Sequence, residues 1–64
     1  MNKFVVKAKF KGPKLDIMVV DRFATREEAE EFIEYCFDLG YVKRDYGYYH
    51  IDMIKCLFIM EQYT

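Results

Sequence analysis

Apolar and basic residues alternate with a period of two from Asn2 to Lys11. This period is typical of a β-strand that buries one face. Gly12 and Pro13 interrupt the alternation and predict a turn, after which residues 14–23 form a second extended segment. Because the connection is short, the two strands are expected to pair as an antiparallel hairpin.

The pattern changes to a helical period between Thr25 and Gly40, and this is the only helix predicted. Thr25 is a suitable N-cap, and Glu28 three residues later completes a capping box. Gly40 stands where a left-handed residue ends a helix. The apolar residues that recur at helical spacing, and so predict the buried side of this helix, are Ala29, Phe32, Ile33, Cys36 and Leu39.

Acidic residues occupy the opposite side of the predicted helix. They are Glu27, Glu31, Glu34 and Asp38. One interpretation is an ordinary solvated surface that keeps a small domain soluble. The other is an acidic face that binds a basic groove on a partner.

The remainder of the chain returns to extended structure. Tyr41 and Val42 restart a strand, residues 43–47 are expected to form a turn or loop, and residues 48–51 a short extended piece. Residues 54–60 form a strong strand, preceded by a bulge or kink at 52–53. The order predicts a single α+β domain over residues 1–64, a two-layer ββαβ(β) fold with one helix packed on one face of a mostly antiparallel sheet.

One helix covers only one face of a sheet, so the other face needs a separate explanation. The face expected under the helix carries Phe4, Val6, Ala8, Phe10, Leu15, Ile17, Val19, Cys56 and Phe58. The face expected to be open carries Val5, Met18, Val20, Leu57 and Ile59, surrounded by Lys3, Lys7, Lys9 and Lys55. An apolar centre with a charged rim is typical of a protein interface. We therefore expect this face, with Lys7 and Lys55 at its rim, to contact a second copy (a homodimer) or another protein; the alternative is a set of scattered apolar side chains without function.

Length and composition limit the function classes. A chain of 64 residues buries only about 60% of the surface of its unfolded state, so its stability is marginal unless a partner, metal or disulfide adds to it. The net charge of −1 gives no general attraction to nucleic acid or membrane, and no apolar run approaches the roughly 20 residues of a membrane span. Together with the absence of a signal-peptide pattern, this predicts a cytoplasmic protein.

Candidate chemistry is sparse. The chain has no serine, a single histidine (His50) and no phosphate loop or paired CxxC, so we expect no enzyme and no cofactor. Cys36 and Cys56 are interpreted as two buried reduced thiols, or alternatively as a disulfide from helix to sheet. Their separation from each other and from His50 does not fit a zinc site, so no metal is expected.

Tyrosines and basic residues are concentrated in one short segment. They are Tyr41, Lys43, Arg44, Tyr46, Tyr48, Tyr49 and His50. The tyrosines could simply pack on the end of the helix with their hydroxyls in water. They could form a protein-binding surface, or, together with the lysines of the first strand, bind single-stranded nucleic acid by stacking and phosphate contacts. The net charge and the acidic helix count against nucleic acid.

The pattern as a whole resembles a group of small proteins. Residues 47–51 (GYYHI), which run into Ile54-Lys55-Cys56 after a threonine-capped acidic helix, look like the small β-β-α-β accessory proteins of bacteria and their phages or mobile elements. The resemblance implies a non-enzymatic accessory or inhibitory role and assigns a role to no individual residue.

Overall fold

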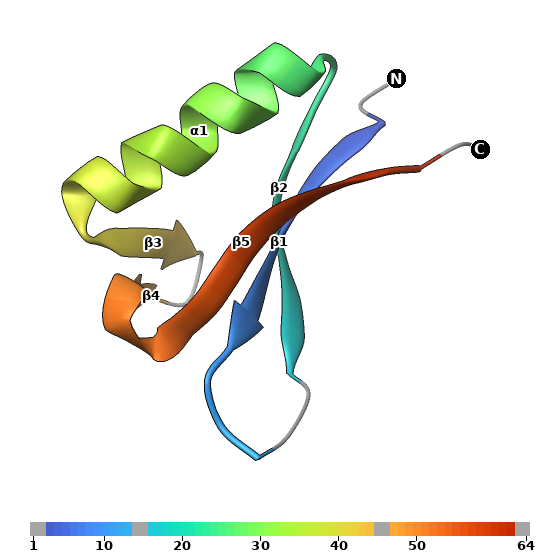
Figure 1. The fold of residues 1–64 in the computed structure, drawn as a ribbon. Coiled ribbons are helices and arrows are strands. Elements are labelled where there is room, and N and C mark those ends of the chain that lie inside the picture. Colours follow the sequence, from blue (N-terminus) through green and yellow to red (C-terminus); the bar gives the residue numbers. More distant parts are fainter. Residues whose placement is uncertain (1–2, 14–15, 45–46, 63–64) are drawn as a thin grey trace.

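The computed structural model describes residues 3–13, 16–44 and 47–62. Their elements, in chain order, are β1 (Phe4–Phe10), β2 (Ile17–Phe23), α1 (Arg26–Leu39), β3 (Tyr41–Arg44), β4 (Gly47–His50), a 3-10 turn (Ile51–Met53) and β5 (Ile54–Glu61). Figure 1 shows the resulting α+β fold, in which the one described helix packs against antiparallel strands. The predicted fold class is thereby confirmed.

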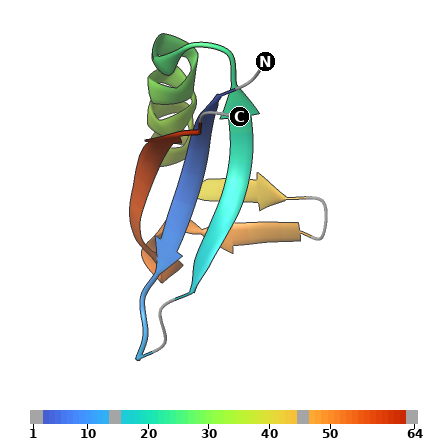
Figure 2. The ribbon, with the colours of Figure 1, turned by 90° about the vertical axis from the view of Figure 1, so that its right-hand side faces the viewer.

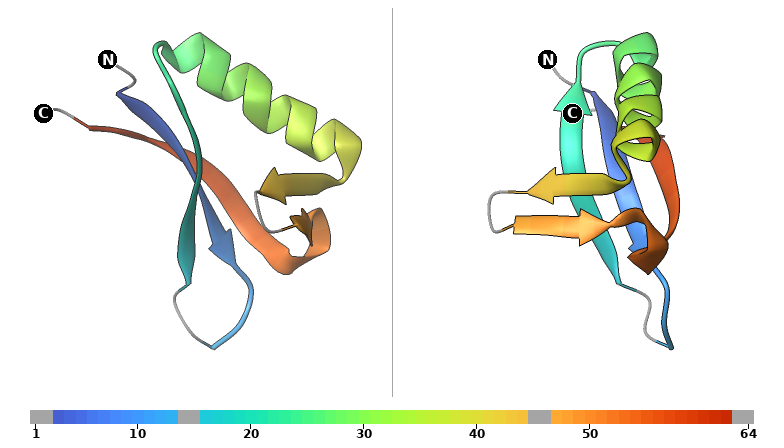
Figure 3. Two further views of the ribbon diagram at one scale, coloured as in Figure 1. Left: turned by 180° about the vertical axis from the view of Figure 1, so that it is seen from behind. Right: turned by 90° about the vertical axis from the view of Figure 1, so that its left-hand side faces the viewer.

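The strands form two antiparallel sheets. In the larger sheet β1 lies between β2 and β5, and in the smaller one β3 pairs with β4. Both α1 and the β3–β4 hairpin lie on the same side of the larger sheet (Figures 1 and 3). Seen from the opposite side in Figure 2, the three strands stand in front, and no other described element covers them.

The ends of α1 follow the sequence signals closely. The Thr25 hydroxyl accepts a hydrogen bond from the backbone N–H of Glu28 at 3.2 Å, and donates one to the Glu28 carboxylate at 3.0 Å. At the other end, Gly40 adopts φ 82°, a left-handed conformation that glycine reaches without steric cost, and its N–H bonds to the Cys36 carbonyl. The predicted helix and its capping box are confirmed.

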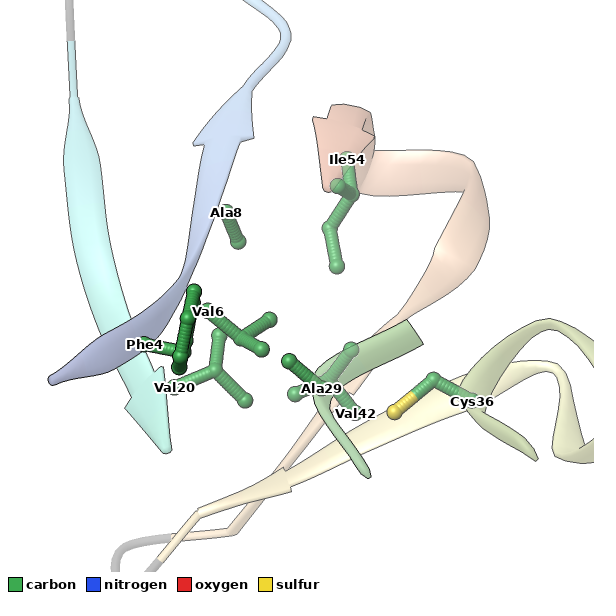
Figure 4. Close-up of a cluster of buried hydrophobic side chains, with 8 residues drawn as sticks. All are labelled: Phe4, Val6, Ala8, Val20, Ala29, Cys36, Val42 and Ile54. Carbon is green, nitrogen blue, oxygen red and sulfur yellow. The ribbon is translucent and has the colours of Figure 1, made fainter. Parts of the chain in front are cut away.

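The core lies between the larger sheet, α1 and the start of the hairpin (Figure 4). Partly buried residues extend it, including Phe23 and Phe32, whose rings lie 5.2 Å apart. Leu39 was expected in this core but is exposed, because it is the last residue of the helix, beyond the sheet that the preceding turns cover. The buried cluster consists of Phe4, Val6, Ala8, Val20, Ala29, Cys36, Val42 and Ile54.

Arg26 fixes the first turn of α1 to the sheet. Its guanidinium lies 5.6 Å from the centre of the Phe4 ring and forms an ion pair with Glu61 at 3.3 Å. Glu61 is the cross-strand partner of Phe4, so one side chain joins the helix start to two strands. The apolar ring and the carboxylate together hold the helix across the sheet.

The assignment of faces is correct for β1 and wrong for β2 and β5. Four residues expected on the open face pack instead on the helix side: Met18, Val20, Leu57 and Ile59. Conversely, Ile17, Val19, Cys56 and Phe58 were expected under the helix, and the register places them on the other face. Leu15, also expected under the helix, lies outside the described residues.

The larger sheet has two register shifts, and the one in β5 explains part of this inversion. One interrupts the β1–β2 pairing between Val6 and Lys7, and the other interrupts the β1–β5 pairing between Lys9 and Phe10. A bulge adds a residue to one strand, so the alternation read on one side of it no longer applies on the other. In β5 the second shift brings Ile54 to the same face as Leu57.

Two local predictions are also corrected. Residues 43–47 were expected to form a loop, but β3 continues to Arg44 and β4 begins at Gly47, with Arg44 and Gly47 paired. Gly47 has a φ of 142°, a conformation that favours glycine at this end of the hairpin. The bulge or kink expected at 52–53 is a turn of 3-10 helix over Ile51–Met53.

Candidate functional site: the open face of the sheet

The strongest candidate surface is the side of the larger sheet that faces away from α1. Cross-strand partners in an antiparallel pair point to the same face, so the register identifies the residues on it. Its charged members are basic, and its other members are apolar or a thiol. This surface, called the open face below, consists of Val5, Lys7, Lys9, Ile17, Val19, Arg22, Cys56, Phe58 and Met60.

Apolar groups on the open face remain accessible to water. Ile17 on β2 keeps 53% of its surface exposed, and Met60 on β5 is also exposed. Val19 and Phe58 are half-buried, and they flank Lys7 on the central strand as its two cross-strand partners. Large exposed apolar side chains on a sheet face that the described elements do not cover favour contact with another molecule.

Val5 is an exception, because it lies on the open face and is nevertheless fully buried, with 0% of its surface exposed. Its cross-strand partners are Arg22 and Met60. Arg22 donates a hydrogen bond from Nη1 to Oε1 of Gln62 at 3.0 Å, which joins the two outer strands across β1. We attribute the burial of Val5 to these long side chains, which leave no part of it available to a partner.

The charges of the open face have one sign. Lys7, Lys9 and Arg22 lie on it, and none of the described residues that the register places there is acidic. The nearby carboxylates are directed elsewhere, since Glu61 pairs with Arg26 at the helix and Asp21 stands opposite Val6, which points into the core. A patch with apolar groups and only positive charge favours a negatively charged partner surface.

The open face therefore differs from the one predicted. Of the residues expected at the interface, Val5 and Lys7 lie on it, and Lys55 is exposed at the bulge of β5. The missed members are Ile17, Val19, Arg22, Cys56, Phe58 and Met60. Neither the alternation in β2 nor that in β5 distinguishes the two faces, because both sets of alternate positions are apolar.

A second candidate surface lies on the β3–β4 hairpin. Tyr41 and Lys43 pair with His50 and Tyr48, so these four share one side of the hairpin. The Tyr41 and Tyr48 rings meet edge to face with centroids 5.1 Å apart. Tyr49, predicted as a contact residue, points the other way and packs on Phe10 at 5.4 Å. Tyr46 and the side chain of Arg44 lie outside the described part of the chain.

An open groove of about 570 Å³ lies where the larger sheet meets the hairpin. Phe10, Lys11, Asp16, Tyr49 and Met53 line it. Backbone hydrogen bonds join four of these residues, from Phe10 N–H to the Asp16 carbonyl and from Lys11 N–H to the Met53 carbonyl. Its described lining offers both a cation, Lys11, and a carboxylate, Asp16, and so favours no one class of ligand. The open face is the better defined surface.

The two cysteines lie in different environments and are both free thiols. Burial raises the pKa of the Cys36 thiol, and the Asp21 carboxylate raises it further, so Cys36 remains protonated at neutral pH. Cys56 was expected inside but is exposed on the open face. Within the described ranges, no three His, Cys, Asp or Glu side chains gather as metal ligands would, and no helix there is long and apolar enough to cross a membrane.

Comparison with known proteins adds no relative to this picture: no protein-family model, no curated protein and no solved structure matches the chain. Its function is therefore inferred from its own surfaces.

Proposed function

We propose that this chain is a non-enzymatic, cytoplasmic protein-interaction domain that binds a second copy of itself or another protein through the open face. The observation that carries the proposal is the exposure of Ile17, Met60 and their neighbours on a sheet face left bare by the described elements. An accessory or inhibitory role of this kind is also what the resemblance to small β-β-α-β proteins implies. A reducing cytoplasm suits a chain whose two cysteines are free thiols.

Physical chemistry supports a binding role for this face. The half-buried apolar side chains of the outer strands gain free energy when a partner removes them from water, at about 25 cal/mol for each Å² of apolar surface. Lys7 and Lys9 stand between them on the central strand, and their charge selects the partner's charge. A chain of 64 residues also has a small core, so an additional buried layer would stabilise it.

The test is a concentration series by sedimentation equilibrium on the wild type and two matched variants. Ile17→Glu places a charge on the open face, and Met53→Glu places one at a residue of almost equal exposure on the 3-10 turn (53% and 55%). We expect the wild type and Met53→Glu to associate and Ile17→Glu to remain monomeric. A wild type that stays monomeric throughout would contradict self-association, and association of Ile17→Glu equal to wild type would exclude the open face.

One observation favours a second candidate function, binding of single-stranded nucleic acid. Tyr41, Lys43, Tyr48 and His50 share one side of the hairpin, and the Tyr48 ring is 65% exposed. Exposed aromatic rings stack on bases, and the adjacent lysine can contact phosphate. The acidic helix and the net charge of −1 weigh against this candidate, because phosphate attraction supplies most non-specific affinity.

A fluorescence titration with an oligothymidine separates the two candidates. If the hairpin binds nucleic acid, Tyr48→Ala weakens binding, whereas Tyr35→Ala, at a tyrosine of similar exposure on α1 (59%), does not. The affinity should also fall steeply as salt is added. Absence of binding at low salt would exclude this candidate and leave the protein-interaction proposal unaffected.

A further inference from the structure

The sign of the charge on the open face argues against a symmetric pair of copies. In a twofold dimer each surface meets its own counterpart. Two open faces brought together in this way would oppose Lys7, Lys9 and Arg22 with the same three cations. None of the three forms an ion pair with a described residue, and the side-chain partner of Arg22 is the neutral Gln62. Like charges juxtaposed in a partly dehydrated contact are unfavourable.

A complementary surface exists on the same chain, on the outer side of α1. Its carboxylates lie at positions i, i+4, i+7 and i+11, so they form a stripe along the helix. All four are exposed, and none makes an ion pair with a residue that the structure describes. This surface, called the acidic stripe below, consists of Glu27, Glu31, Glu34 and Asp38.

The acidic stripe is flanked by aromatic rings that are also exposed. Tyr35 follows Glu31 by four residues, Phe37 follows Glu34 by three, and both rings lie on the surface. By helical geometry the two rings fall on opposite flanks of the stripe. The outer side of α1 therefore offers what the open face lacks, negative charge, together with apolar groups that can meet Ile17 and Phe58.

The two surfaces also match in length. Eleven residues of helix separate Glu27 from Asp38, which corresponds to about 16 Å at 1.5 Å per residue. On the open face the outermost cations are Arg22, which stands beside Val5, and Lys9. Val5 and Lys9 are four residues apart on β1, which corresponds to about 13 Å at 3.3 Å per residue. A helix laid along the strands would thus place the carboxylates over the same span as the cations.

We propose that copies of this chain assemble head to tail, with the acidic stripe of one copy seated on the open face of the next. This inference rests on the proposed function and names its partner. The two surfaces lie on opposite sides of one molecule (Figures 2 and 3), so they cannot meet within a chain. Each contact leaves one open face and one acidic stripe unoccupied at the ends, so the assembly grows beyond a dimer unless it closes into a ring.

Charge-reversal variants test this arrangement by sedimentation velocity at several protein concentrations. The sheet variant is Lys7→Glu with Lys9→Glu. Its control is Lys11→Glu with Lys43→Glu, which makes the same change in net charge at two exposed lysines that belong to neither surface as defined above. We expect the sheet variant to remain monomeric and its control to assemble as the wild type does.

The helix variant is Glu31→Lys with Glu34→Lys, and its control is Asp16→Lys with Asp52→Lys, at exposed carboxylates elsewhere. The helix variant alone is expected to be monomeric. Mixed with the sheet variant it should assemble again, because the intact acidic stripe of one variant fits the intact open face of the other and the two reversed surfaces also carry opposite charges. The chain that carries all four reversals keeps the wild-type net charge of −1 and should assemble again.

Each contrary result has a separate meaning. A helix variant that associates like the wild type, or a mixture of the two defective variants that stays monomeric, would overturn the head-to-tail arrangement and leave association through the open face standing. A wild type that is monomeric throughout would overturn both this inference and self-association. Oligothymidine binding that the sheet variant loses, with the wild type monomeric, would assign the open face to nucleic acid and likewise overturn the inference.

Discussion

Arg22 and Gln62 are 40 residues apart in the chain and hydrogen bond across β1, with 3.0 Å between Nη1 and Oε1. The bond links the outer strands β2 and β5 over the central strand, on the side away from the helix. Beneath it, Val5 has no exposed surface although no described element forms a second layer on that face. One end of the open face is thus closed by the protein's own side chains, and the other end is left to a partner.

The burial of Val5 gives a stability prediction. Val5→Ala removes buried apolar carbon and should lower the free energy of unfolding by about 2 kcal/mol. Val19→Ala, at a half-buried position on the same face, should cost about 1 kcal/mol or less. Urea denaturation of the two variants checks the difference. Equal losses would mean that Val5 is no better covered in solution than Val19.

The N-cap of α1 gives a second prediction. Thr25→Ala removes the oxygen that accepts the Glu28 N–H, and should reduce stability by about 1 kcal/mol, as N-cap truncations typically do. Thr25→Ser keeps the oxygen and serves as the matched control. Circular dichroism during thermal unfolding measures both. A Thr25→Ser variant as unstable as Thr25→Ala would show that the methyl group, rather than the cap, carries the effect.

The buried thiol makes stability depend on alkaline pH. Burial and the Asp21 carboxylate raise the pKa of Cys36 in the folded state, so the unfolded thiol releases its proton at a lower pH than the folded one. The free energy of unfolding is therefore unaffected by this thiol below its ordinary pKa of about 8.5, and it falls as the pH rises above that value. Urea denaturation between pH 7 and pH 10 should show a steeper loss for the wild type than for Cys36→Ala. Parallel losses would indicate that other groups dominate this range.

Salt should weaken the proposed contact between copies. Lys7 and Lys9 are half-buried and the acidic stripe is exposed, so their attraction is screened as the Debye length falls from about 10 Å at 0.1 M to about 3 Å at 1 M. We expect the sedimentation coefficient of the wild type at fixed protein concentration to decrease as sodium chloride is added. An increase would indicate association driven by apolar contact alone.

The sequence predicts the helix and the central strand because the residue at each position there favours one secondary structure and one side of the sheet. Thr25, Glu28 and Gly40 mark both helix ends by separate mechanisms. In β1, Lys7 and Lys9 cannot occupy the core, so Phe4, Val6 and Ala8 must. Local chemistry and the tertiary fold agree at these residues.

The outer strands could not be assigned in the same way. Met18 and Val20 alternate with Ile17 and Val19, so either set could be buried, and the choice follows from pairing with β1. In β5, Lys55 and Leu57 are two residues apart, so strict alternation places them on the same face. The charge of Lys55 then predicts that this face is solvated. The bulge beside Lys9 breaks that alternation, which leaves Lys55 exposed while Leu57 packs on the core. Bulges depend on contacts between distant segments, which single-strand periodicity does not encode.

The full length of the hairpin strands was missed for a related reason. Lys43 and Arg44 look like loop residues because they are charged, yet their strand has one side in the core and one in water. Val42 is fully buried and Tyr49 packs beside it in the same cluster. Tyr41-Val42-Lys43-Arg44 does not alternate between apolar and polar residues and has only four positions, so its pattern does not distinguish a strand from a loop.

The most direct test of the open face uses Cys56, a native probe on that surface. Cys56 is exposed whereas Cys36 is buried, so an alkylating reagent followed by intact-protein mass spectrometry reports the accessibility of Cys56 first. The rate should fall as protein concentration rises, in parallel with the appearance of larger species by sedimentation. A Cys56 rate that stays constant while the larger species form would contradict the claim that the open face is the contact surface.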